Sequence, residues 1–341
     1  MAAGCLAAWR GMKRKRVKQI KVGLIDVDAQ KKVRFPNLAL MRISAYHKAL
    51  GDEVEWYQPP LITPWYDLVY MSKVFSESYS PDMPEPLNAG KVIKGGTGYC
   101  ISLGADGKEQ FDKSMNVGLP SEIERMFPDY SIYPQFDYAL SMTSRGCPRG
   151  CGFCHVSAKE GRCAVKVADV RDFWNGQGEI KILDPNITAC KDKRDLIGRY
   201  LETGAVLDFT QGLDIRLLDD EDIRDLRQMR LGGIHFAWDN PKEDLRDRFL
   251  YYSKNGKHNR HGHLATVYVL TNYERCSVEE HIERALFRIY ALRDMKYDPY
   301  VMIYDKPHAD RRLLDLQRWC NTFIIIKACP RFEDYDPKKF Y

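Results

Sequence analysis

Three cysteines lie within eight positions of one another in the stretch SRGCPRGCGFCH, residues 144–155. Cys147, Cys151 and Cys154 form a C-x3-C-x2-C pattern. Thiolates are soft ligands, and groups of them select zinc, copper(I) or iron–sulfur clusters. The chain has ten cysteines. At its N-terminus a short apolar patch precedes the basic run, which is the reverse of the order in a secretory signal. We therefore interpret the clustered thiols as metal ligands rather than as part of a disulfide framework.

The number of clustered cysteines helps to decide which of these metals the loop binds. A structural zinc site takes four protein ligands. The nearby fourth candidate, His155, directly follows Cys154 and would have to bend back sharply to share one ion. A cubane [4Fe–4S] cluster usually has four cysteine ligands, so three leave one iron open to another ligand. Gly146, Gly150 and Gly152 suit a loop that wraps a cluster, because glycine tolerates unusual backbone angles. The pattern favours this cluster, and a zinc-knuckle nucleic-acid-binding module is the alternative.

The cysteine loop directly follows a predicted strand, DYALSMTS, at residues 137–144. Five more apolar stretches follow at roughly thirty-residue intervals, each succeeded by a helical pattern: EIKILD, AVLDFTQGLDIRLL, GGIHFAWD, LATVYVLTNY and PYVMIYD. Alternating strands and helices predict a parallel sheet, and such sheets bind ligands at the carboxyl ends of their strands. We expect the cysteines at that edge. The stretch TFIIIKAC, residues 322–329, is predicted to add an edge strand.

With Phe153 before the last cysteine, the loop resembles the C-x3-C-x-aromatic-C signature of radical S-adenosylmethionine (SAM) enzymes. The resemblance covers residues 137–326 and implies the partial (β/α)6 barrel of that family. It implies that Cys147, Cys151 and Cys154 bind the [4Fe–4S] cluster and that the open iron binds SAM. An external electron donor such as flavodoxin or ferredoxin would drive cleavage of SAM to a 5′-deoxyadenosyl radical. That radical abstracts hydrogen from a substrate, which the sequence does not identify.

The resemblance also implies SAM contacts at the strand ends. Phe153 resembles the aromatic residue that lies against the adenine. The family often has a Gly-Gly-Glu stretch facing the SAM amino group; this chain has LDPNI there, so Asp184 and Asn186 are the substitutes. Asp239 and Asn240 end the fourth strand. For each of these positions, the alternative is a capping or turn residue. The remaining assigned residues are Gln211, Asp214 and Arg216 in TQGLDIR, and Thr271 and Asn272 in VLTNYE.

Residues 21–103 form a smaller strand–helix–strand pattern. The stretches VGLIDVD, FPNLALMRISAYHKALGDEVEWY and VIKGGTGY resemble a shortened, degenerate cobalamin-binding domain of Rossmann-like fold. The Asp-x-His-x-x-Gly motif that supplies a cobalt ligand is missing, and His47 lies in the middle of the predicted helix. We favour a domain that helps to shape the substrate site. A cobalamin-dependent radical SAM methyltransferase is the alternative.

Composition sets the other expectations. The net charge is +5, and the basic run near the start marks residues 1–20 as a disordered arm that is solvated or touches nucleic acid. Residues 104–136 are predicted to be a linker and residues 327–341 a C-terminal tail. No apolar run reaches the roughly 18 residues that span a bilayer. The sequence therefore predicts a cytoplasmic α/β protein that does not bind to a membrane.

Overall fold

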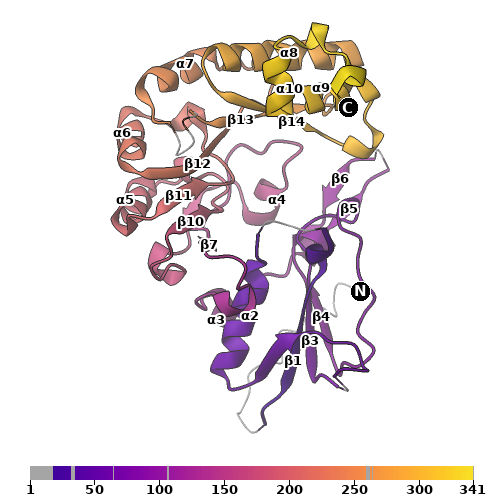
Figure 1. Ribbon diagram of the computed structural model, residues 1–341. Coiled ribbons are helices and arrows are strands. Elements are labelled where there is room, and N and C mark those ends of the chain that lie inside the picture. The colour runs from indigo at the N-terminus through magenta and orange to yellow at the C-terminus, as the bar shows by residue number, and fades with distance from the viewer. Residues whose placement is uncertain are drawn as a thin grey trace. The chain divides into compact units, whose positions relative to one another are not determined.

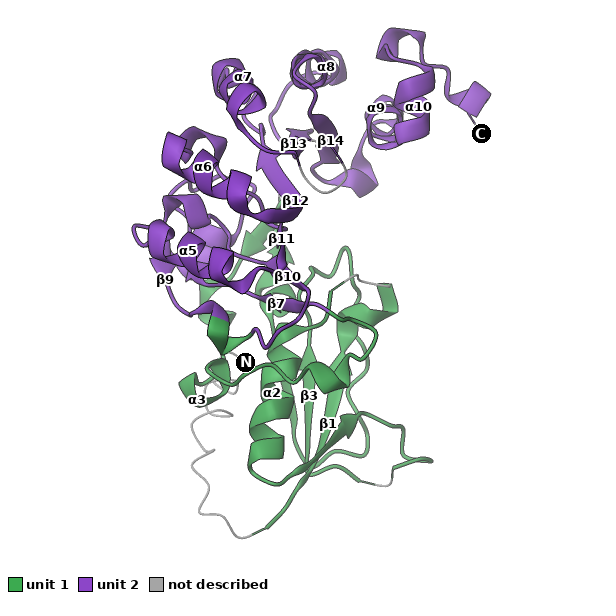
Figure 2. Ribbon diagram, turned by 60° about the vertical axis from the view of Figure 1, so that its left-hand side comes forward, with its two compact units in different colours: residues 1–137, 171–173 green, residues 138–170, 174–341 purple. Residues whose placement is uncertain are grey.

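The structure is a computed structural model, and the chain divides into two compact units, residues 1–137 with 171–173 and residues 138–170 with 174–341 (Figure 2). Each unit contains a parallel β-sheet, so the expected α/β fold is confirmed at that level. Most of the predicted arm, residues 1–17, lies outside the described residues. The structure describes residues 18–31, 35–63, 65–105, 107–258, 262 and 264–340.

The first unit is built on a four-stranded parallel sheet with the order β2-β1-β3-β4 (Figure 1). Helix α2 (Leu38–Ala49) connects β1 to β2, as the sequence predicts. The connections after β2 and β3 have no helix among their described residues. The strands are β1 (Lys21–Asp26), β2 (Glu53–Trp56), β3 (Leu68–Ser72) and β4 (Val92–Gly95).

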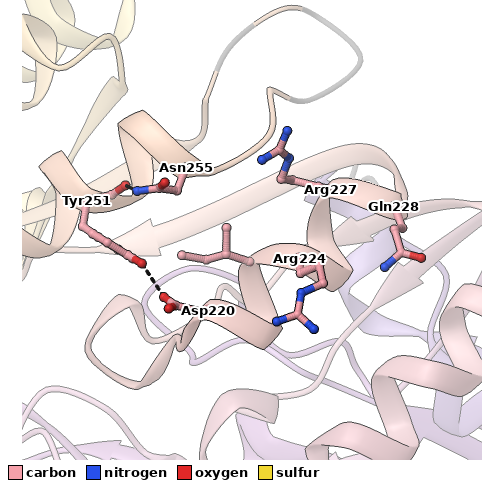
Figure 3. A pocket seen from close by; sticks show the side chains of 7 residues that line it. Asp220, Arg224, Arg227, Gln228, Tyr251 and Asn255 are labelled. Carbon is pink, nitrogen blue, oxygen red and sulfur yellow. Dashed lines mark hydrogen bonds between the residues drawn. The ribbon is translucent and has the colours of Figure 1, made fainter.

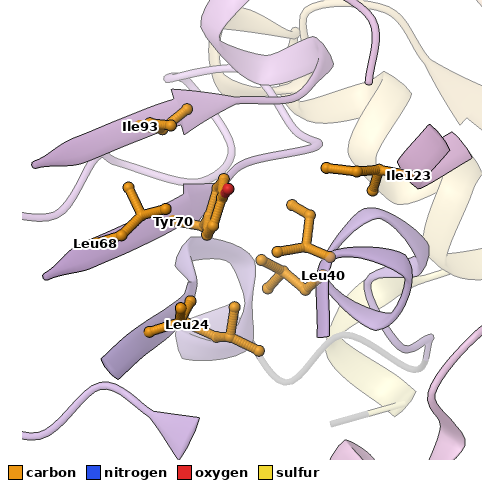
Figure 4. Packing of buried hydrophobic residues seen from close by; sticks show 8 residues of the cluster. Leu24, Leu40, Leu68, Tyr70, Ile93 and Ile123 are labelled. Carbon is orange, nitrogen blue, oxygen red and sulfur yellow. The ribbon is translucent and has the colours of Figure 1, made fainter. Parts of the chain in front are cut away.

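Local sequence signals set both ends of α2. The side chain of Asn37 accepts a hydrogen bond from the backbone N–H of Leu40, which caps the start of the helix. Gly51 follows the helix with a φ of 81°, a left-handed conformation that favours glycine. The helix packs its apolar residues on the sheet, and Figure 4 shows the resulting core. This core consists of Val22, Leu24, Leu40, Ile43, Leu68, Tyr70, Ile93 and Ile123.

The segment predicted to be a linker, residues 104–136, packs as part of the first unit. Ile123 is fully buried in the core of that unit. Arg42 on α2 pairs with Glu124 at 2.7 Å, and Lys48 pairs with Asp129 at 2.6 Å. The elements after β4 are η2 (Thr97–Cys100), β5 (Ile101–Leu103), β6 (Glu109–Phe111), η3 (Lys113–Met115), α3 (Ser121–Glu124) and η4 (Tyr130–Ile132).

The second unit contains a six-stranded parallel sheet with the order β14-β13-β12-β11-β10-β7. All six stretches predicted as strands are present, and strands that follow one another along the chain are neighbours in the sheet. The strands are β7 (Ala139–Ser141), β10 (Glu179–Ile182), β11 (Val206–Phe209), β12 (Arg230–Ala237), β13 (Thr266–Thr271) and β14 (Asp298–Ile303).

A helix follows each strand of this sheet, and the longer helices lie along one side of it (Figure 1). Side chains such as Ile180, Phe236 and Val267 alternate toward the buried face of the sheet and are fully buried. No described helix is both long and apolar enough to cross a bilayer. The helices are α4 (Val156–Glu160), α5 (Lys193–Thr203), α6 (Asp220–Gln228), α7 (Arg246–Asn255), α8 (Val278–Asp294) and α9 (Arg311–Asn321).

The predicted edge strand at residues 322–329 is wrong, because the chain forms helix α10 (Phe323–Ala328) there. The place of such a strand beside β14 is taken by side-chain amides. Asn321 accepts from the backbone N–H of Val301 at 2.8 Å and donates to its carbonyl at 3.0 Å, and Gln317 donates to the same carbonyl at 3.0 Å. These bonds occupy both backbone groups of Val301, so neither is left to pair with another strand at this point of the edge.

Candidate cofactor site

The three cysteines lie in a loop that follows β7, at the carboxyl end of that strand. Two short strands, β8 (Ser144–Arg145) and β9 (Val165–Lys166), pair antiparallel and bring the start and end of the loop together. The backbone N–H of Cys147 donates to the carbonyl of Gly161 at 3.1 Å across the loop. The loop is therefore closed on itself by backbone pairing.

Glycine is required at the entrance of the loop. Gly146 has a φ of 89°, and a Cβ atom there would lie 2.1 Å from the carbonyl oxygen of Cys163. Gly150 has a φ of 60°. Both values lie in the left-handed region that other residues rarely adopt. These two glycines allow the chain to pass Cys163 and turn between the cysteines, in line with the expectation from the sequence.

The thiols lie close enough to influence one another. Cys147 is half-buried, and Cys151 and Cys154 are exposed. Burial is the main cause that raises the pKa of both Cys151 and Cys154, and negative charge on the neighbouring thiols and on Asp239 raises it further. Such thiols keep their protons near pH 7 until a metal displaces them.

Among the described residues, no three Cys, His, Asp or Glu side chains are arranged to hold a single metal ion. Sulfur ligands of one tetrahedral zinc ion lie about 3.8 Å apart, because each Zn–S bond is about 2.3 Å long. The arrangement therefore gives no support to a zinc ion shared by the three cysteines and His155. In a [4Fe–4S] cluster each thiolate binds a different iron, so the sulfurs stand further apart. The donors fit this cluster in number and in kind.

Asn186 is the predicted SAM residue that contacts a cysteine directly. Its side chain is buried, and its amide Nδ2 donates to Sγ of Cys147 at 3.5 Å. Its Oδ1 accepts from the hydroxyl of Thr188 at 2.7 Å, which fixes the amide in this orientation. A hydrogen bond to a sulfur ligand stabilises the thiolate and tunes the metal that it binds. The structure thus places Asn186 against the cysteine loop.

Asp184 is buried, and its oxygens are engaged by the residues before the loop. It accepts hydrogen bonds from the backbone N–H groups and hydroxyls of both Thr143 and Ser144. A carboxylate has about four lone-pair sites, so little capacity is left for a ligand. Burial raises the pKa of Asp184, and these four hydrogen bonds oppose that effect. The contacts match the capping role given above as the alternative for this position.

An ion-pair network connects the cysteine loop to the end of β11. Arg149, between the first two cysteines, donates from Nε to Oδ2 of Asp214 at 2.6 Å. Arg216 donates from Nε to Oδ1 of Asp214 at 2.6 Å and from Nη1 to Glu243 at 2.7 Å. Burial alone would raise the pKa of Asp214, but the Arg216 and Arg149 hydrogen bonds outweigh it and hold that pKa below its usual value. Gln211, predicted with this group, is exposed.

The structure also brings Phe153 to the segment after β13. The Phe153 ring packs edge-on against Tyr273 at 5.4 Å, and Tyr273 packs edge-on against Tyr304 at 5.0 Å. Asn272 has a φ of 64° and donates from Nδ2 to the carbonyl of Tyr304 at 2.8 Å. Thr271 is buried on the other face of the strand, and its hydroxyl has no hydrogen-bond partner among the described residues. Phe153 and Asn272 thus share one region, whereas Thr271 faces the helices.

Sequence reasoning missed Arg288, which organises the ends of two strands. Its side chain is 2% exposed on α8. The guanidinium donates to the carbonyls of Trp238 at 2.6 Å, Asp239 at 3.0 Å and Leu270 at 3.1 Å. Desolvation lowers its pKa to about 10. An arginine within the apolar stripe of the predicted helix was the signal that could have identified it.

Asp239 lies two residues after the end of β12, and the sequence placed it at the end of the fourth predicted strand without a specific contact. Its Oδ1 accepts from the backbone N–H of Leu270 at 3.2 Å. Burial raises its pKa to about 6, and the positive charges of Arg288 and Arg216 oppose that rise. The charge of Asp239 in turn raises the pKa of the Cys151 thiol. A titratable carboxyl therefore lies near the cysteine loop.

A polar row lies on the other face of the second unit's sheet. Lys181 pairs with Oδ2 of Asp208 at 2.9 Å. His235 bonds from Nδ1 to the carbonyl of Phe209 at 3.1 Å, and its ring stacks on Tyr268 at 5.6 Å. A carbonyl partner on Nδ1 fixes the proton there in the neutral ring, so Nε2 is the acceptor. These side chains give that face hydrogen-bonding groups of both kinds.

No family model and no curated protein matches this chain. It is similar to two solved structures of the cobalamin-dependent S-adenosylmethionine radical enzyme OxsB. The one with aqua-cobalamin and S-adenosylmethionine bound gives a TM-score of 0.38 at 13% identity, covering 88% of this chain and 54% of the other. The apo, selenomethionine-labelled one gives 0.38 at 11% identity, covering 87% and 52%. The chain therefore spans about half the length of these proteins.

Proposed function

We propose that this protein is a radical SAM enzyme in which Cys147, Cys151 and Cys154 hold a [4Fe–4S] cluster. The observation that carries the proposal is the loop of three thiols, closed by its own ribbon at the carboxyl end of β7. When bound, the cluster and SAM supply a 5′-deoxyadenosyl radical for hydrogen abstraction from a substrate, after reduction by an external donor such as flavodoxin or ferredoxin.

The chain's own residues would hold and shield this site. Asn186 donates to the sulfur of Cys147 and so favours its thiolate form. Asp214 binds Arg149 and thereby anchors the loop between its first two cysteines. The edge-on contact of Phe153 with Tyr273 covers one side of the loop with apolar surface. Together these contacts orient the thiols and restrict the access of water.

For SAM we propose contacts from Phe153, Arg216 and Asn272, with Gln211 as an exposed further candidate. Asp214 and Asn186 would act by positioning Arg216 and Cys147 respectively. We also propose that the six-stranded sheet is the partial (β/α)6 barrel, over residues 137–326. Its polar row of Lys181, Asp208, His235 and Tyr268 would then face the substrate. We propose that Asp184 and Thr271, which the resemblance placed among the SAM contacts, are structural residues instead.

The first unit is proposed to be a degenerate relative of cobalamin-binding domains that has lost the cobalt ligand. His47, its helix histidine, is 1% exposed. Its Nδ1 bonds to Oδ2 of Asp52 at 2.8 Å and its Nε2 to the hydroxyl of Tyr70 at 3.0 Å. Both ring nitrogens are therefore engaged inside the unit. These residues do not fit a histidine ligand to cobalt, and no step is assigned to cobalamin.

The test is anaerobic purification followed by iron analysis and assay of SAM cleavage. We expect a brown protein with about four irons per chain. After reduction with dithionite, it should release 5′-deoxyadenosine from SAM, as detected by mass spectrometry. Cys151→Ala should abolish both properties, because it removes one of the three thiols.

The matched control is Cys163→Ala, which removes an exposed cysteine at the end of the same loop. Its thiol lies outside the three-cysteine pattern, so iron content and SAM cleavage should persist. A colourless protein after careful reconstitution, or one zinc per chain in place of iron, would contradict the proposal. Equal losses in both variants would show that the wrong cysteines have been assigned.

A further inference from the structure

A groove of about 480 Å³ lies between α6 and α7 in the second unit (Figure 3). It is formed entirely by residues outside the proposed cofactor site. Two arginines and two side-chain amides project from its walls, together with one tyrosine. The lining residues are Asp220, Ile223, Arg224, Arg227, Gln228, Tyr251 and Asn255.

The charges of α6 are separated between its two sides. On the side toward α5, Asp222 pairs with Lys193 at 2.7 Å, and Glu221 pairs with Arg194 at 3.3 Å. The acids on that side are thus neutralised by basic residues of the neighbouring helix. The arginines of α6 are absent from these pairs. They belong to the groove instead.

Arg224 and Arg227 are exposed, and the guanidinium of neither has an ion-pair or hydrogen-bond partner in the part of the chain that is described. The acid that lines the groove, Asp220, is engaged by the hydroxyl of Tyr251. Lys257 adds a third cation at the end of α6, where its Nζ donates to the carbonyls of Arg227 at 2.9 Å and Met229 at 2.7 Å. The groove therefore has an excess of positive charge.

Tyr251 presents an aromatic surface beside these cations. Tyr251 is 45% exposed as a residue although it lines the groove. The hydrogen bond to Asp220 fixes one end of the side chain, and Nδ2 of Asn255 donates to the Tyr251 carbonyl at 2.8 Å. The side chain is thus held in place on a residue that is exposed. Unpaired guanidiniums next to a fixed, exposed aromatic ring suit a chain of phosphates and bases.

We propose that this groove binds a single-stranded nucleic acid. Arg224 and Arg227 contact successive phosphates, and a base stacks on Tyr251. Inorganic phosphate would leave the aromatic ring and the amides without contact, and an acidic peptide offers no base to stack. The inference goes beyond the radical SAM proposal and does not depend on it, because no residue of the groove belongs to the cysteine loop.

The test measures binding of the full chain to fluorescein-labelled twelve-nucleotide oligo(U) and oligo(dT) by fluorescence anisotropy over a range of salt concentrations. We expect binding of one or both, weakened by salt. The double variant Arg224→Glu/Arg227→Glu should bind about ten-fold or more weakly, and the slope of log K against log salt should fall by about 1.4, the value for two lost phosphate contacts on a single strand. The control Lys338→Glu/Lys339→Glu makes the same change in net charge at exposed positions elsewhere.

Tyrosine variants test the stacking contact separately. Tyr251→Ala should weaken binding roughly five-fold or more, whereas Tyr251→Phe keeps the ring and should bind nearly as well as the unchanged protein. Equal effects of the arginine and lysine double variants would overturn the proposal, as would the absence of binding by the unchanged protein. Competition by poly-glutamate that is as strong as that by oligo(U) would assign the groove to acidic peptides instead. Iron content and SAM cleavage should be unchanged in Arg224→Glu/Arg227→Glu, so this test and that of the enzyme fail independently.

Discussion

At the scale of single residues, the cysteine loop depends on a glycine as much as on its thiols. A side chain at Gly146 meets two obstacles, the φ of 89° and the carbonyl of Cys163 at 2.1 Å. The first costs about 1 to 2 kcal/mol in an L-residue, and the second forces the backbone of the loop to move. The exit and entrance of the loop are therefore locked in one geometry.

We expect Gly146→Ala to lower the free energy of unfolding by at least about 1 kcal/mol and to reduce iron content after reconstitution. Urea denaturation and iron analysis measure the two effects. Gly178→Ala is the matched control, because nothing lies within 4 Å of its Cβ position and its φ lies outside the left-handed region. Similar results for the two variants would show that the loop tolerates a side chain at its entrance.

The titration of Asp239 predicts a pH-dependent stability. Its pKa rises from 3.8 to about 6 on folding because the carboxyl is buried. Between pH 3.8 and about pH 6 the folded state therefore keeps a proton that the unfolded state releases. The stability that this proton binding contributes is fully present below pH 3.8 and is lost as the pH rises above about 6. Asp239→Asn removes the charge and keeps the shape. Relative to the unchanged protein, it should gain up to about 3 kcal/mol between pH 4 and pH 7, as measured by urea denaturation of the iron-free chain. A difference that does not vary with pH would contradict the assignment.

At the scale of elements, the ends of β12 and β13 are joined by Arg288 from α8. Arg288→Met should destabilise the fold by about 3 to 5 kcal/mol, because several buried carbonyls lose their donor at once. Chemical denaturation measures the change. Arg312→Met removes an exposed arginine that pairs with Glu279, so it should cost less than about 1 kcal/mol. Comparable costs at the two positions would contradict the role of Arg288.

The elements show which features a sequence can predict. The six strands of the second unit were predictable because apolar runs and helical patterns alternate locally. The helix α10 was not, because the edge of β14 is capped by Asn321, a residue outside the apolar run that was read as a strand. The packing of residues 104–136, predicted to be a linker, was not foreseen for a similar reason, since Ile123 packs on residues far away in the chain.

In the candidate site too, features that are local in the sequence could be predicted, whereas contacts between distant residues could not. The cysteine pattern and its glycines are local, so their spacing was enough to identify the loop. The contact of Asn186 with Cys147 joins residues 39 positions apart, and that of Arg149 with Asp214 joins residues 65 apart. Such pairings depend on the order of strands in the sheet, which places the ends of β10 and β11 near the loop. Sequence position alone could name Asp184 but could not show that its oxygens are already engaged.

At the scale of the whole molecule, the two units make different predictions about cofactors. The first unit should show no affinity for cobalamin through histidine, because both nitrogens of His47 are engaged by Asp52 and Tyr70. Adding hydroxocobalamin to the full chain should leave its visible absorption spectrum unchanged. A shift that disappears in His47→Ala would overturn this expectation, whereas a shift that persists in that variant would indicate binding without the histidine.

The paired strands β8 and β9 have a consequence for how the thiols meet iron. Because β8 and β9 join both ends of the loop, the residues between them lose most of their conformational entropy when the protein folds. Little more is lost when the metal binds. Iron should therefore bind quickly to a preformed loop, and chelators should be able to remove it. The surrounding fold should stay intact when the metal is removed.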